Sequence, residues 1–372
     1  MTTEGLEKPT PTAVAEAAPA DQPGSGYVPE TGRERLLRIL SFRNISALYI
    51  FVALFVIFAF WVPDTFLKDS TWKAMIDSQA ITAMVAVALV IPVTAGAFDL
   101  AIGTEVGLGG ILVAWFLSSQ GLPIVPAIVL TILAGGLIGL GSGLLITKAR
   151  ITTFIATLGV SSVLAAMIIW VSGGQQILNL GRNFQEISTG TIGWFTYPVY
   201  IMLVIALFAW YVLERTEIGR HVYATGGNPD AAKLAGVNTS RVIIGALIAC
   251  GAISACGGVM LSASLGTGDP TTGPAYLLPA FSAVFLGSTQ FRGGRFNVWG
   301  TVVAVFVLAT GVKGLQLAGA PVWIPELFNG AALLLAVGLA NYERSGARFF
   351  GLGRLLPAFR RGGGAAPSEG AG

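Results

Sequence analysis

The run VGLGGILVAWFLSSQGLPIVPAIVLTILAGGLIGLGSGLLIT, residues 106–147, decides the fold class of this chain. It contains no charged residue, and it is about twice as long as the ~20 apolar residues with which an α-helix crosses a bilayer. Gly121, Pro123 and Pro126 in its middle mark a turn, because glycine and proline interrupt helices. The stretch therefore predicts two consecutive membrane-spanning helices rather than a soluble core.

The composition extends this prediction to the whole chain. Its 372 residues have a mean hydropathy of +0.74 and are 54% hydrophobic but only 11% charged, whereas soluble domains carry about 25% charged residues. The net charge of +3 gives no indication of nucleic-acid binding. Two cysteines and one histidine are too few for a disulfide framework or a zinc site, so we expect no metal ion in this chain.

Eight further charge-free runs predict one crossing each, although the last is short and would be extended by residues 321–324 at the interface. The sequence thus predicts an all-α polytopic membrane protein with about ten transmembrane helices. These runs are 45–63, 78–98, 151–171, 194–213, 242–268, 270–291, 296–312 and 327–342. Residues 44–343 would thus form the transmembrane domain, with its longest inside loop at 214–241. Residues 1–43 are predicted to be a disordered segment and residues 344–372 an Arg- and Gly-rich tail.

The positions of the basic residues predict how these helices cross the membrane. If the N-terminus lies inside and the chain crosses ten times, the inside segments hold 18 of the 22 Lys and Arg residues. Cytoplasmic loops carry such an excess in membrane proteins. We therefore expect the N- and C-termini, and the loop 214–241, to be cytoplasmic.

The loop 214–241 contains a short helix with clear start and stop signals. Asn228 is a good N-cap, Pro229 fits the first helical position, and Gly236 is a natural C-cap. So short a helix is marginal in water and needs a surface on which to dock. Two interpretations remain: a helix lying on its own membrane domain, or a knob that fits a cytoplasmic partner.

Asp99 follows an apolar run, and Glu105 lies close by in the sequence. A carboxylate at membrane depth is costly and tends to line a cavity or a broken helix, and Gly96 and Gly103 would permit a break. One interpretation is a discontinuous segment near the translocation path or inner gate, with Asp99 accepting hydrogen bonds from backbone amides or solute hydroxyls. The other is an inside loop in which both carboxylates are solvated. A proton relay is disfavoured, because no second buried carboxylate is evident beside Asp99.

Four motifs carry a resemblance to a known family. They are GRHVYATGGNPDAAKLAGV at 219–237, GAFDLAIG at 96–103, TLG at 157–159 with SGG at 172–174, and GGR at 293–295 with VWGT at 298–301. From about residue 81 to residue 339 the chain resembles the membrane-spanning permease subunit of ribose/xylose-type sugar ABC importers, a binding-protein-dependent transport permease family.

The resemblance, together with the placement of Asp99 and Glu105, gives candidate site residues of two kinds. The helix that couples the permease to its ATPase would consist of Gly227, Asn228, Pro229, Asp230, Ala231, Ala232, Lys233, Leu234, Ala235 and Gly236. The translocation path or gate is assigned to Asp99, Glu105, Thr157 and Tyr276. The sequence departs from the family at 275–279, AYLLP, where the family usually shows Gly-Tyr-Glu-Leu-Asp, so the acids expected at Leu277 and Pro279 are missing.

The resemblance also implies partners and a location, the bacterial cytoplasmic membrane. We expect an ABC ATPase dimer that holds ATP and Mg²⁺, an extracytoplasmic substrate-binding protein, a second permease copy in a homodimer or heterodimer, and membrane lipid, but no nucleic acid. This chain has no phosphate-binding GxxxxGK[ST] loop, so hydrolysis would take place on the ATPase and no cofactor is expected here.

The predicted function is therefore that of a permease subunit of an ATP-driven importer that moves a small polar solute, a monosaccharide, by alternating access. The alternative is a stand-alone secondary transporter or channel, in which Asp99 and Glu105 would carry ion coupling. An integral membrane enzyme is disfavoured, because the sequence shows no cluster of His, Cys or carboxylate residues at catalytic spacing.

Overall fold

The computed structural model describes residues 46–289 and 294–344. In these ranges the regular elements are helices, apart from a hairpin of two-residue strands, β1 (Thr191–Ile192) and β2 (Phe195–Thr196), which confirms the predicted all-α class. The segments predicted to be a disordered N-terminus (1–43) and a basic tail lie outside the described residues, apart from the start of the tail at 344.

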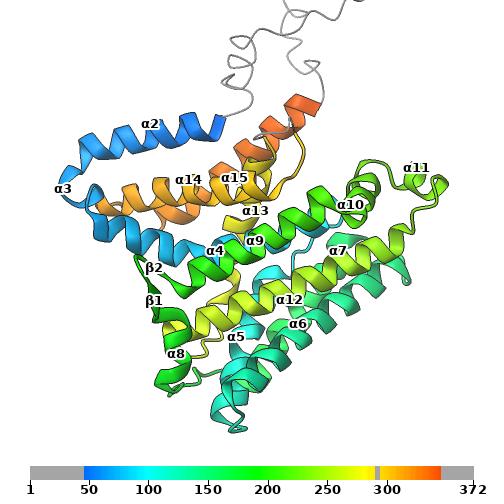
Figure 1. Ribbon diagram of the computed structural model, residues 1–372, viewed down its shortest axis with the longest axis horizontal. Coiled ribbons are helices and arrows are strands. Elements are labelled where there is room, and N and C mark those ends of the chain that lie inside the picture. The colour runs from blue at the N-terminus through cyan, green and yellow to red at the C-terminus, as the bar shows by residue number, and fades with distance from the viewer. Residues whose placement is uncertain (1–45, 290–293, 345–372) are drawn as a thin grey trace, which may run out of the picture. The chain divides into compact units, whose positions relative to one another are not determined.

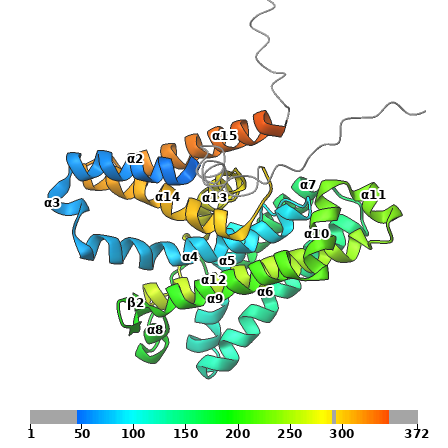
Figure 2. The same ribbon diagram turned by 45° about the horizontal axis from the view of Figure 1, so that its top comes forward.

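Each predicted span coincides with a helix (Figures 1 and 2). In chain order these are α2 Ser46–Trp61, α4 Asp69–Thr94, α5 Ile102–Ser118, α6 Ile124–Thr147, α7 Thr153–Ser172, α9 Tyr197–Arg215, α12 Thr239–Leu265, α13 Leu277–Ser288, α14 Val298–Leu317 and α15 Ile324–Arg344. Short elements connect them: α3 Pro63–Phe66, α8 Arg182–Thr189, α10 Glu217–Gly227, α11 Pro229–Leu234 and the 3₁₀ helix η1 Gly273–Tyr276.

Six of these helices are long and apolar enough to cross a bilayer, namely α4, α6, α7, α9, α12 and α14. The other four predicted spans coincide with shorter apolar helices. The run 106–147 is divided as its glycine and prolines indicate: α5 ends at Ser118, Gly121 adopts a positive φ of 62°, and Pro123 caps α6. The chain is thus a polytopic helical membrane protein.

Helix α12 packs along α6, α5 and α4 (Figure 1). Against α6 the contact is made by three glycines, Gly135, Gly139 and Gly143, because a Cβ atom at any of them would collide with the α12 backbone. Small residues at a four-residue spacing let two helix backbones approach closely. The glycine repeat in this part of the sequence is therefore a helix-packing face.

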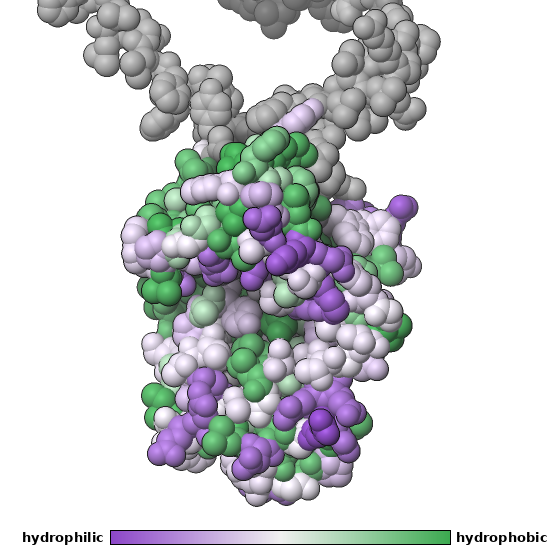
Figure 3. Space-filling model, turned by 90° about the vertical axis from the view of Figure 1, so that its left-hand side faces the viewer, coloured by the Kyte–Doolittle hydropathy of each residue, from purple (hydrophilic) through white to green (hydrophobic). Residues whose placement is uncertain are grey.

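The outer sides of the bundle remain apolar. Large side chains of α6 and α7 are exposed, among them Val125, Leu137, Ile155 and Trp170, with Trp170 at 81% exposure. Contiguous apolar surface of this kind marks contact with lipid or another protein. Hydrophilic side chains gather instead on the end of the bundle that carries α3, α8 and the hairpin (Figure 3).

Helix α4 begins before the predicted apolar run 78–98 and ends before that run does. Its first turns are polar and carry an ion pair of 2.6 Å between Lys73 and Asp77, one helical turn apart. The helix contains Pro92 and ends at Thr94; Gly96 then turns the chain with φ of +83°, a conformation that glycine adopts without strain. The residues between Gly96 and Ile102 therefore form a break that separates two helices, with Gly96 at the turn, whereas Gly103 lies within α5.

Candidate functional site

Asp99 lies in this break and is fully buried. Its Oδ1 accepts a hydrogen bond of 3.0 Å from the amide of Ala101, just before α5 starts, and its side chain is 0% exposed. Glu105, in the first turn of α5, is 1% exposed. The interpretation of a loop with two solvated carboxylates is wrong, because α5 turns back against α12 and covers both side chains.

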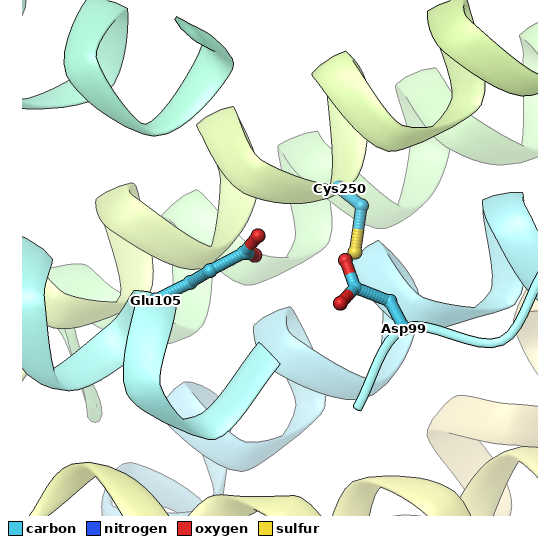
Figure 4. Close-up of side chains that lie close together, drawn as sticks. All are labelled: Asp99, Glu105 and Cys250. Carbon is cyan, nitrogen blue, oxygen red and sulfur yellow. The ribbon is translucent and has the colours of Figure 1, made fainter. Parts of the chain in front are cut away.

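Asp99 and Glu105 meet the thiol of Cys250 from α12. One ligand atom of each residue lies within 4.8 Å of the others. In Figure 4 the sulfur of Cys250 points at the Asp99 carboxylate, and the Glu105 carboxylate reaches toward the same space. Asp99 therefore does have a second buried carboxylate beside it. The sequence does not show this, because the distance between the two carboxylates depends on how the break and α5 pack against α12.

The polar atoms of this cluster are poorly satisfied. Asp99 Oδ2 and both carboxylate oxygens of Glu105 have no hydrogen-bond partner among the residues that the structure describes. The same holds for Ser254 Oγ, one turn along α12 from Cys250, although this hydroxyl faces both Glu105 and Cys250. Orphaned polar atoms in a buried position are rare and call for a physical explanation.

Thr157 and Tyr276, the other two predicted path residues, lie in different places. Thr157 is buried, and its hydroxyl donates to Thr153 O at 2.8 Å and to Phe98 O at 3.4 Å, so it joins α7 to the break. Tyr276 ends η1 and lines a cavity of about 280 Å³ between α4, α13, α14 and α15. The structure thus brings Thr157 to the break that carries Asp99, through the carbonyl of Phe98, but places Tyr276 at a separate cavity.

The cavity beside Tyr276 is lined by neutral polar side chains as well as apolar ones. Ser78, Gln79 and Thr82 come from α4, and Asn329 comes from α15. Among the described residues, no charged side chain lines it. Sequence reasoning missed these residues, because neutral polar groups at the edge of an apolar run give no periodic signal.

The two positions that lack the usual acids have different surroundings. Pro279 lines the same cavity as Tyr276, so a carboxylate there would face the cavity. Leu277 packs against α5, since its Cβ would lie 3.4 Å from a Cβ placed at Gly103. Leu277 therefore makes an apolar contact with α5, and Pro279 forms a neutral part of the cavity wall.

The predicted short helix of the loop 214–241 is α11. Asn228 Oδ1 accepts hydrogen bonds from the amides of Asp230 and Ala231 at 3.1 and 3.0 Å, which confirms the N-cap. At the other end Gly236, with φ of +86°, and Val237 donate to the carbonyls of Lys233 and Ala232, the pattern of a Schellman C-cap. Both helix ends are closed by the residues that the sequence pointed to.

The apolar face of α11 is uncovered. Leu234 is 92% exposed, and Ala231 and Ala235 are exposed beside it, whereas Ala232 is buried toward the rest of the chain. Lys233 pairs with Asp230 at 3.3 Å on the solvent side. One of the two interpretations was that the helix lies on its own membrane domain. Within the described residues, the apolar face of α11 does not dock there. Its role in coupling stays a prediction.

Helix α10 connects α11 to the transmembrane helices at two points. The hydroxyl of Tyr223 donates to Phe296 O at 2.8 Å, and the Arg295 guanidinium lies 4.8 Å from the Tyr223 ring centroid, ahead of α14. Gly226 packs on the end of α4, because a Cβ atom there would overlap the Thr94 carbonyl oxygen. A cavity of about 700 Å³ lies between these contacts.

Comparison with known proteins identifies the chain as a transport component. Residues 74–337 match the family described as "Branched-chain amino acid transport system / permease component". The ribose import permease of Haemophilus influenzae is 30% identical over 81% of this chain and 93% of its own length. The L-arabinose ABC transporter permease of Azospirillum brasilense is 28% identical over 88% of this chain and 95% of its own length. The fructose import permease of Rhizobium meliloti is 29% identical over 80% of this chain and 85% of its own length.

No solved structure matches the chain. The family match covers most of the transmembrane helices, and several of the most similar relatives are import permeases that agree with the chain over nearly their whole length. The resemblance deduced from the motifs is thereby confirmed. This multi-pass membrane protein belongs to the family of branched-chain amino acid transport system permease components, and it is similar to import permeases that are named for sugars.

Proposed function

We propose that the chain is the permease subunit of an ATP-binding-cassette importer that moves a monosaccharide across the bacterial cytoplasmic membrane by alternating access. The relatives named for ribose, L-arabinose and fructose support a sugar as solute. The domain that carries this function is residues 44–343, crossing the membrane ten times with both termini inside. The four shorter apolar helices would supply the crossings that six long helices leave open.

The observation that carries the proposal is the uncovered apolar face of α11. A capped helix of six residues that exposes 92% of Leu234 has no reason to persist in water unless a partner covers it. An ATPase dimer that holds ATP and Mg²⁺ would bind there. The contacts of α10 with Thr94 and Phe296 would pass its movement to α4 and α14.

The neutral cavity beside Tyr276 supports a sugar over an amino acid. Gln79, Asn329 and Ser78 offer amide and hydroxyl groups that exchange hydrogen bonds with sugar hydroxyls. A zwitterionic amino acid would instead require charged partners in a buried site, because burial of an unpaired charge is costly. We therefore assign this cavity to the solute path, together with Tyr276.

The opposite end of the protein would meet the substrate-binding protein. Helix α8 is held there with Leu180 and Phe184 buried beneath it, and Asn183 and Glu186 line a cavity of about 480 Å³ on its surface. A second permease copy would complete the pathway. Its identity decides between a homodimer and a heterodimer.

Reconstitution tests the proposal. Proteoliposomes with this chain, its ATPase and its binding protein should take up labelled ribose, arabinose or fructose only when ATP and Mg²⁺ are present on the ATPase side, and should leave leucine outside. Uptake by the chain alone, driven by an ion gradient, would instead establish the secondary transporter. ATP-driven uptake of leucine in place of sugar would overturn the assignment of the solute while leaving the importer intact.

A further inference from the structure

The cluster of Asp99, Glu105 and Cys250 lies deep in the bundle. Cys250 is the twelfth residue of α12, a helix of 27 residues, so it lies roughly 16 Å from the start of that helix at 1.5 Å per residue. Ionisable side chains at such a depth are rare and mark a function. The cluster belongs neither to the solute cavity beside Tyr276 nor to the α11 surface.

The two carboxylates need positive charge. Two buried carboxylates side by side repel each other, and burial of unpaired charges costs several kcal/mol each. Among the described residues, no Lys, Arg or His forms an ion pair with Asp99 or Glu105. The amide of Ala101 satisfies only one oxygen of Asp99. The compensating charge therefore has to come from protons or from a bound cation.

The donor atoms favour a cation. A thiol and two carboxylates converge within 4.8 Å, and the orphaned hydroxyl of Ser254 faces Glu105 and Cys250 from the same helix. Ligands in a tetrahedral zinc site lie about 2.0–2.3 Å from the metal, hence about 3.3–3.8 Å from one another. The three donors would have to approach one another by rotation of their side chains to reach that range, and Ser254 or a water molecule would complete four ligands.

We propose that Asp99, Glu105 and Cys250 bind one divalent metal ion of the zinc class. The mixture of a thiolate with carboxylates suits the borderline-soft Zn²⁺, whereas Mg²⁺ and Ca²⁺ prefer oxygen alone. We expected no metal site because the sequence has few cysteines and histidines. The proposed site instead uses one thiol and two carboxylates, which only the fold brings together.

The ion has a structural role in this arrangement. Asp99 belongs to the break after α4, Glu105 to the first turn of α5, and Cys250 to the middle of α12. A closed metal site with three protein ligands would fix the break against α12. Metal binding then adds to the stability of the folded protein, because the unfolded chain has no such preformed site.

Metal analysis of the full chain tests the proposal without any transport assay, so its failure is distinct from failure of the proposed function. The chain, purified in detergent with a tag free of histidine, should contain one zinc ion per molecule. Exchange for Co²⁺ should produce a near-ultraviolet thiolate-to-metal charge-transfer band. C250S should lose this band, whereas C256S, which changes the half-buried cysteine on the same helix, should keep it.

Two results would overturn the site. One is a folded wild-type chain that stays metal-free after incubation with Zn²⁺ and gives no thiolate band with Co²⁺. The other is a band that persists in C250S. The first would mean that protons neutralise Asp99 and Glu105, and the second that the other thiol, Cys256, holds the cobalt. The wild-type spectrum decides the question even if the substituted chains fail to fold.

Discussion

Gly226 of α10 lies directly against the carbonyl oxygen of Thr94, the last residue of α4, so that no side chain fits between them. Gly96 completes the contact, since a Cβ placed there would lie 3.5 Å from the Cα of Gly226. The loop that carries α11 therefore touches the backbone at the point where α4 breaks. A displacement of α10 has to displace the end of α4, because two packed backbones cannot absorb it.

Replacement of Gly226 by valine should separate α10 from α4. Overpacking at a close backbone contact costs about 1–3 kcal/mol, and we expect a lower melting temperature together with loss of solute-stimulated ATP hydrolysis in the assembled importer. G141V, which makes the same change at an exposed glycine of α6, is the matched control, because a Cβ at Gly141 has nothing within 4 Å. Equal behaviour of both variants would contradict the coupling contact.

Replacement of Leu234 by aspartate should weaken binding of the ATPase. Burial of a leucine side chain contributes about 1.5–3 kcal/mol, so affinity should fall roughly tenfold to hundredfold. Co-purification and titration of the ATPase measure this effect. V322D, at a position that is 95% exposed between α14 and α15, should leave the affinity unchanged. Normal ATPase affinity of L234D would remove α11 from the interface.

Replacement of Gly139 by leucine should destabilise the contact of α6 with α12. A Cβ atom at Gly139 would collide with the Leu247 carbonyl group, so we expect a loss of about 1–3 kcal/mol in a thermal denaturation assay in detergent. G141L tests the other side of the same helix, because a Cβ at Gly141 meets nothing within 4 Å. A stable G139L with an unstable G141L would reverse the assigned packing face.

Truncation of Gln79 or Asn329 to alanine should impair solute movement. Each lost hydrogen bond to the solute is worth about 1 kcal/mol, which corresponds to a roughly fivefold higher KM for uptake. S162A removes an exposed hydroxyl of α7 that bonds only within its own helix, and it should transport normally. Unaltered uptake kinetics in both Q79A and N329A would place the solute path elsewhere.

The loop after α12 should respond to acid through Asp269. The hydroxyl and amide of Thr271 donate to this carboxylate and, with Gln176, hold the pKa of Asp269 below its usual value. A lowered pKa in the folded state stabilises the loop above the unfolded pKa of about 3.9, and this contribution is lost as the pH falls through the lowered value. Amide hydrogen exchange at Thr271 should therefore be faster in D269N than in the wild type at pH 7.

The same difference should vanish at a pH below the lowered pKa, where both side chains are uncharged. Between pH 5 and pH 8 the exchange protection from Asp269 should stay constant once intrinsic exchange rates are subtracted, since the carboxylate is ionised throughout. Equal exchange of the two proteins at pH 7 would show that the charge of Asp269 does not stabilise the loop.

The helices and their ends were largely predictable from the sequence. Apolar runs report helices because a bilayer demands about 20 apolar residues in succession. Asn228 and Gly236 indicate the ends of α11 in the sequence, because capping interactions form within one helical turn. The start of α4 was placed too late, at 78 instead of Asp69, because its polar first turns are helical without being apolar. The helix of span 270–291 was placed too early, since η1 precedes α13.

The candidate site was predictable only in part. Asp99 stood out because a carboxylate beside glycines in an apolar region is unusual. Its neighbours Cys250 and Ser254 come from a helix about 150 positions later in the chain, and nothing in their local sequence separates them from ordinary packing residues. Gln79 and Asn329 were missed for the same reason.

The sequence by itself determined which segments are helices, where α11 is capped, and the family to which the chain belongs. Only the tertiary structure decided that Glu105 and Cys250 lie beside Asp99, that Gly226 rests on Thr94, and that Gln79 shares a cavity with Asn329. The physical reason is that the helices of this protein are apolar on nearly every side. Hydrophobicity then tells a helix to enter the membrane, but not which face it turns toward its neighbours; the close fit of glycines and buried polar groups settles that only once the helices pack.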